Sequence, residues 1–173
     1  MRVAGLAVTT GMLVAAVGAM RAASRLDRLH VRTDASWAAL DAALCQRAQT
    51  VSGLGAGVAM RIAADAALWA RAPAVPGSSA SGVLGAGAHA AREEVENELS
   101  RALALLDRTA LEPACARRLA DAEQRVVIAR RVYNDAVRDT LALRSHRRVR
   151  WLRLAGRAPL PRYFEIAEPV LPG

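Results

Sequence analysis

The feature that most limits how this chain can fold is an apolar seam at helical spacing in its C-terminal half. Between about residues 114 and 145, small and apolar residues recur every three or four positions: Leu119, Ala122, Val126, Ala129, Tyr133, Ala136, Thr140 and Leu143. This period is typical of one long helix that packs against others through a coiled-coil-like face. The seam therefore predicts a helical bundle with Tyr133 in its core.

Three further helices are predicted before the seam. The first runs from residue 21 to about residue 51, where Trp37, Leu40, Leu44 and Val51 form an apolar stripe. Glycines at 53, 55 and 57 then interrupt the pattern, and the remaining expected segments are a helix over about 58–72, a Pro/Gly/Ser-rich connection over 73–87 and a helix over about 88–110. Four helices with short connections predict an all-α, antiparallel four-helix bundle.

Alanine shapes how such a bundle can pack. Forty of the 173 residues are Ala, which favours helix strongly but contributes little buried area per residue. We therefore expect helices that lie close together through small side chains, with few large residues to fill a deep core.

The N-terminal segment is free of charge over residues 3–20. As a helix, this stretch would be about 27 Å long, near the thickness of the hydrocarbon core. It predicts an uncleaved transmembrane anchor over residues 1–22; the alternative is a cleaved signal peptide, which would make this a secreted helical protein. Because Arg residues follow the stretch more densely than they precede it, we expect a single-pass protein of the plasma membrane, with its N-terminus outside and its bulk in the cytoplasm.

The positive charge of the chain is concentrated near its C-terminus. Of a net charge of +8, seven Arg residues lie between Thr140 and Phe164, where there is no acidic residue. This predicts a basic, Pro-containing tail over residues 146–173 that follows a helical domain over 23–145. Anionic lipid headgroups are the expected partner, with the bilayer surface contacted by Arg147, Arg148, Arg150, Trp151 and Arg153. Two alternatives are nucleic acid, which the scarcity of aromatic residues disfavours, and a tail folded onto the bundle with Trp151 and Leu154 in the core.

No residue pattern predicts a metal, a cofactor or a catalytic centre. The two cysteines, Cys45 and Cys115, stand in no metal-binding spacing, and the three histidines are isolated from them and from one another. Whether the cysteines pair is left open. Tyr133 and Asn134 are adjacent to no nucleophile or base in sequence, so we expect Tyr133 to be a packed residue whose hydroxyl binds a buried acceptor.

Several stretches of the chain resemble the LemA family. Residues 123–139, EQRVVIARRVYNDAVRD, are similar to the family's signature helix, and the match rests on Glu123, Ile128, Ala129, Arg130, Arg131, Tyr133, Asn134, Ala136 and Val137. Residues 36–51 resemble its first soluble helix, residues 96–103 its third, and PLPRYFEI at 159–166 its terminal Tyr-Phe-Glu stretch. The chain departs from the family at 52–57, in the short approach to the signature and at Asp139-Thr140-Leu141.

The resemblance implies a transmembrane helix followed by a cytoplasmic helical bundle, and it implies no enzymatic activity. From it we expect a non-enzymatic, membrane-tethered interaction or scaffold module with an unidentified protein partner. Association with further copies of the chain is left open as an alternative. The alternatives are a basic lipid-binding or nucleic-acid-binding regulatory module.

Overall fold

In the computed structural model, the described residues are 2–54, 86–151 and 160–166, with the backbone alone described at 2–11, 14–15, 86–88, 148 and 150. Within these ranges the chain is entirely helical apart from turns and one extended segment. The helices are α1 (Arg2–Ser52), α3 (Ala86–Ala104), α4 (Pro113–Ser145) and the short α5 (Arg147–Trp151), with one 3-10 turn, η1, at Arg108–Ala110.

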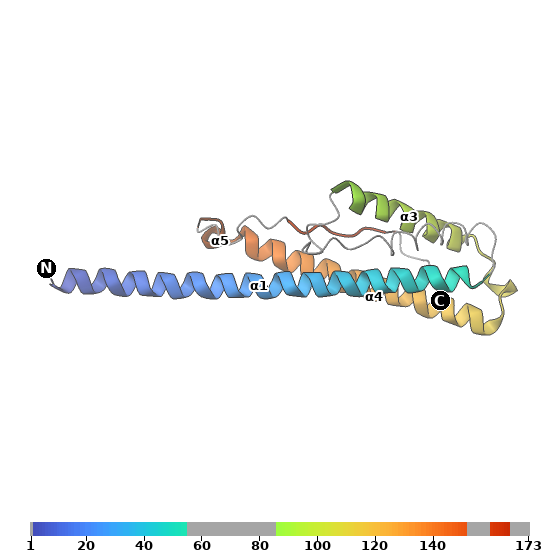
Figure 1. The fold of residues 1–173 in the computed structure, drawn as a ribbon, viewed down its shortest axis with the longest axis horizontal. Coiled ribbons are helices and arrows are strands. Elements are labelled where there is room, and N and C mark those ends of the chain that lie inside the picture. Colours follow the sequence, from blue (N-terminus) through green and yellow to red (C-terminus); the bar gives the residue numbers. More distant parts are fainter. Residues whose placement is uncertain (1, 55–85, 152–159, 167–173) are drawn as a thin grey trace.

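Helices α1 and α4 form an antiparallel pair that is the axis of the molecule (Figure 1). Both have the Ala-rich, helix-favouring composition predicted for them. Helix α1 ends where the glycines begin, since Ser52 is its last residue. Helix α4 begins at Pro113, where a missing backbone N–H costs nothing because the first amides of a helix have no internal partner. Helix α3 lies along one side of this pair, and the N-terminal part of α1 extends past the end of α4 (Figure 1).

The predicted seam of α4 is confirmed. Seven of its eight residues are buried, and Ala129 is half-buried against the same core. The largest cluster joins Leu40 and Leu44 of α1 to Val126, Tyr133 and Val137 of α4. Other members of this cluster come from the extended segment 160–166, which supplies Phe164 and Ile166.

The predicted four-helix bundle is wrong. The described chain has three long helices, and the predicted helix over 58–72 lies outside the described residues, as does most of the predicted connection over 73–87. The predicted third helix also ends early, at Ala104 rather than near residue 110. The Asp107 carboxylate accepts hydrogen bonds from the Thr109 backbone N–H at 3.0 Å and from its hydroxyl at 2.6 Å, which starts a separate 3-10 turn instead.

The predicted transmembrane anchor is also not supported. Among the residues searched, which are the described ones, no helix combines the length and the apolar character needed to cross a membrane. The location at the plasma membrane stays a prediction.

Candidate docking site between helices α1 and α4

The pair Tyr133-Asn134 fastens the C-terminal segment to α4. The Tyr133 hydroxyl donates to the Arg162 carbonyl at 2.8 Å. The Asn134 amide is used twice: its nitrogen donates to the Phe164 carbonyl at 3.1 Å, and its oxygen accepts from the Phe164 backbone N–H at 2.9 Å. Burial raises the pKa of Tyr133 to about 12, so the phenol stays a neutral donor. The predicted core position of Tyr133 and its buried acceptor are confirmed.

An aromatic cluster holds the same segment from the other elements. The Trp37 ring of α1 lies 4.9 Å from His89 of α3, 5.2 Å from Tyr133 and 5.5 Å from Phe164, measured between ring centroids. These separations fall in the range in which aromatic pairs attract one another. His89 is 6 % exposed and its Nε2 has no hydrogen-bond partner. The cluster joins three helices and the extended segment through side chains distant in sequence.

Because His89 is buried, its pKa is lowered, although the nearby Glu93 opposes this and Arg162 adds to it. The folded chain then binds fewer protons than the unfolded chain below pH about 6.5. We expect the free energy of unfolding to fall as the pH drops from about 6.5 towards the lowered pKa, by at most about 1.4 kcal/mol for each pH unit. Urea denaturation of wild type and His89→Leu across pH 8 to 5 measures this.

Towards low pH, the unfolding free energy of wild type should fall relative to that of His89→Leu. His146→Leu makes the same substitution at an exposed position and is the matched control. A wild-type stability with the same pH dependence as His89→Leu would contradict a buried, neutral His89.

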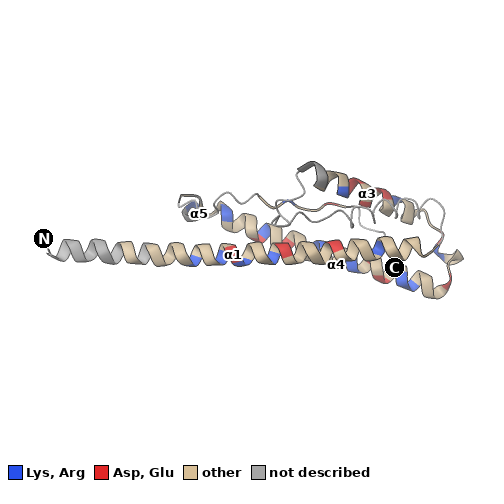
Figure 2. Cartoon of the chain, viewed as in Figure 1, with Lys and Arg blue, Asp and Glu red and all other residues tan. Residues whose placement is uncertain are grey.

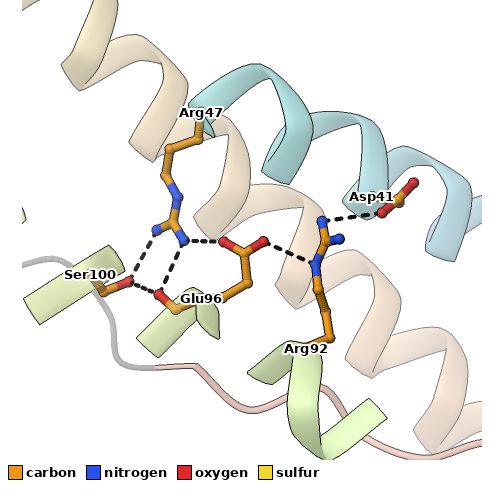
Figure 3. A network of polar contacts seen from close by, with 5 residues as sticks. All are labelled: Asp41, Arg47, Arg92, Glu96 and Ser100. Carbon is orange, nitrogen blue, oxygen red and sulfur yellow. Dashed lines mark hydrogen bonds and ion pairs between the residues drawn. The ribbon is translucent and has the colours of Figure 1, made fainter. Parts of the chain in front are cut away.

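A buried ionic network joins α1 to α3 (Figure 3). Arg47 Nη2 lies 2.6 Å from Glu96 Oε2, and these two side chains are 1 % and 0 % exposed. Arg92 Nε lies 3.0 Å from the other Glu96 oxygen, and Arg92 Nη2 lies 3.3 Å from Asp41 Oδ1. The network contains two cations and two anions, so it is balanced in charge. Because Asp41 is partly buried, desolvation raises its pKa, an effect that Arg92 opposes.

Ser100 completes the network by accepting from Arg47 Nη1 at 3.1 Å and donating to the Glu96 carbonyl at 2.9 Å. Sequence patterns alone assigned no role to the pairing of Arg47 with Glu96. The available signal was that Arg47 lies on the apolar stripe of α1, four positions before Val51 and three after Leu44. A charge on such a stripe indicates a buried partner. The role of the network is to fix how α3 sits on α1.

A second buried carboxylate, Glu123 of α4, receives two hydrogen bonds from Arg108 in the turn before that helix, at 2.7 and 2.9 Å. On the surface of α4, Arg138 lies 2.8 Å from Asp135. Glu123 therefore also has a structural role, because it holds the turn between α3 and α4 in place.

A shallow apolar groove lies between α1 and α4. It has a volume of about 520 Å³ and is lined by Ser36, Ala39, Ala42, Ala43 and Gln46 of α1 and by Arg125, Ile128, Ala129 and Val132 of α4. Ile128 is 52 % exposed and Val132 is 47 % exposed. Arg125 donates to Gln46 at 2.8 Å and ties the two helices together at one end of the groove.

The groove lies on the face of the helix pair turned away from α3. Asp41, which pairs with Arg92 of α3, is two positions from Ala39, and two positions turn a helix by about 200°. On α4, Asn134 binds the C-terminal segment and is likewise two positions from Val132. One face of the α1–α4 pair is therefore covered by α3 and the segment 160–166, and the other carries the groove.

The residues predicted to contact lipid lie elsewhere, on and after α5. Val149 is buried against Leu26 of α1 and Leu143 of α4, so α5 packs on the helix pair. Trp151 is 86 % exposed, which shows that the alternative with Trp151 in the core is wrong, and Arg147 is exposed as well. The side chains of Arg148 and Arg150, and all of Arg153 and Leu154, lie outside the described residues. Figure 2 shows basic residues at the α5 end of the molecule. Lipid contact stays a prediction.

The remaining candidates for chemistry are the two cysteines and clusters of metal-binding side chains. Cys45 and Cys115 are both free thiols, and burial raises the pKa of Cys45, which makes its thiolate harder to form. Among the described side chains, no three of the His, Cys, Asp and Glu residues gather so that they could hold a metal ion.

Compared with protein-family models, with curated proteins and with solved structures, the chain has no significant match in any of the three.

Proposed function

We propose that this chain is a helical interaction module, without catalytic activity, that docks a protein partner in the groove between α1 and α4. The observation that carries the proposal is the half-exposed pair Ile128 and Val132, one turn apart on α4, beside the small residues of α1. Exposed apolar side chains that line a common groove are typical of protein-binding surfaces. Arg47, Glu96, Glu123 and Tyr133, in contrast, use their buried polar groups to hold helices and the C-terminal segment together.

We also propose that the module is a divergent relative of the LemA family. The support is a contact between two stretches that resemble the family separately. Tyr133 and Asn134, from the signature-like stretch, bind backbone groups of Arg162 and Phe164, from the Tyr-Phe-Glu-like stretch, through three hydrogen bonds. A structural dependence of one stretch on the other gives a physical reason for both to occur in one chain.

Photo-crosslinking from the groove tests the docking function. With p-benzoylphenylalanine in place of Ile128 or Val132, irradiation of cells should give discrete adducts of higher mass. The matched control is Leu105, which is 89 % exposed and apolar but lies just after α3, away from the groove. Absence of adducts from both groove positions, or the same adducts from position 105, would contradict a docking site here.

A further inference from the structure

We infer that the occupant of the α1–α4 groove is the same groove of a second copy of this chain, so that two helix pairs form an antiparallel four-helix bundle. This inference rests on the proposed docking function and names the partner. It starts from the two unlike sides of the groove. The α4 side presents the large side chains Ile128 and Val132, and the α1 side presents Ala39, Ala42 and Ala43.

Large residues on one helix and small residues on its neighbour are complementary to each other. A two-fold axis in the interface and parallel to the helices places α4 of one copy over α1 of the other. Residues that line the groove together lie at the same height along the pair, as the Arg125–Gln46 hydrogen bond shows. The axis keeps this height, so Ile128 and Val132 of each copy meet the alanines of the other.

The same two-fold rotation also makes neighbouring helices of the two copies antiparallel. Helices α1 and α4 are antiparallel within one chain (Figure 1). An axis parallel to them preserves the direction of each helix, so every neighbouring pair in the assembly is antiparallel: α1 with α4 within each copy and α4 with α1 between copies. This is the arrangement of an up-down four-helix bundle. In this assembly, the second copy supplies the two helices that pack on the face left open by the described elements of the first.

Charge does not oppose the contact. Between residues 35 and 46, the exposed strip of α1 that α4 of the second copy would meet consists of Ala35, Ala38, Ala39, Ala42 and Gln46, none of which is charged. The exposed Arg32, one turn earlier, is paired with Asp139 of its own chain. Arg125 at the end of the groove therefore meets a neutral surface, and its hydrogen bond to Gln46 already satisfies part of its guanidinium. The α3 side cannot serve in this way, because α3 and the segment 160–166 cover it.

Light scattering on the purified full chain tests the assembly. We expect wild type at twice the chain mass of 18.3 kDa and Ile128→Glu at 18.3 kDa, with unchanged helical circular dichroism because Ile128 is on the surface. Leu105→Glu and Met20→Glu change apolar residues outside the groove that are more exposed than Ile128, and these variants should stay dimeric. A monomeric wild type, or loss of the dimer in Met20→Glu instead of Ile128→Glu, would overturn the inference.

Disulfide trapping tests the arrangement. In a background of Cys45→Ala and Cys115→Ala, a chain with Ala42→Cys is mixed with a chain with Ile128→Cys, so a bond between these positions can form only between copies. We expect the mixed pair to crosslink and the Ile128→Cys chain alone not to, because the two α4 helices are diagonal. Crosslinking between two copies of residue 128 would overturn this geometry. If wild type is monomeric while position 128 crosslinks a different protein in cells, the docking function stands and self-association fails.

Discussion

Replacing Glu96 with Ala is expected to lower the free energy of unfolding by about 3–5 kcal/mol. The Glu96 carboxylate lies between Arg47 Nη2 at 2.6 Å and Arg92 Nε at 3.0 Å, and all three side chains are nearly inaccessible to water. Without that carboxylate, two cations share a buried site in which Asp41 is the remaining anion. Urea denaturation at neutral pH, followed by circular dichroism, measures the loss.

The control for this prediction is on the same helix. Glu94 is exposed on α3, so Glu94→Ala removes the same chemical group without uncovering a buried charge and should cost well under 1 kcal/mol. The double variant Arg47→Met, Glu96→Met should recover much of the loss, since apolar side chains of similar volume can replace a buried ion pair. A loss from Glu96→Ala no larger than that from Glu94→Ala would show that the α1–α3 network does not support the fold.

Tyr133→Ala is expected to destabilise the chain by about 3–5 kcal/mol, because it leaves a cavity among Trp37, Phe164 and Val137 and frees the Arg162 carbonyl. Tyr133→Phe keeps the ring and removes only the hydroxyl, so about 1 kcal/mol is expected. Both values are read from urea denaturation. The Tyr163→Ala variant is the control, because this neighbouring Tyr is 41 % exposed.

The relative destabilisation of the two Tyr133 variants separates the contribution of the ring from that of the hydroxyl hydrogen bond. If Tyr133→Phe were as destabilising as Tyr133→Ala, the hydrogen bond to the C-terminal segment would dominate and the ring would contribute little. If Tyr133→Ala unfolded at the same urea concentration as wild type, Tyr133 would not be a core residue.

The inferred dimer gives a role to a second apolar face of α4, which is distinct from the predicted seam. The seam of α4 faces the core of its own chain, whereas Ile128 and Val132 lie off that seam at a separation of four residues. Two apolar faces on one helix predict two layers of neighbours. The inferred assembly has a second layer that comes from another chain, so a count of helices within one sequence does not give it.

The features that could be predicted for this protein depend on residues that are near one another in the sequence. Helical period fixed α4, the burial of its seam and the position of Tyr133, because side chains three and four apart share one face. The glycines that follow Ser52 marked where α1 ends, and Pro113 marked where α4 begins, since glycine and proline both change the conformations open to the backbone. These properties need no knowledge of distant contacts.

The tertiary structure decided which surfaces face one another, and this depends on residues far apart in the chain. It paired Arg47 with Glu96, placed Phe164 on Asn134 and paired Glu123 with Arg108. It also left one face of the α1–α4 pair as a groove, opposite the face that α3 covers. A helix of this composition has several faces able to pack, and the choice among them is made by the free energy of pairing whole elements, which no local pattern contains.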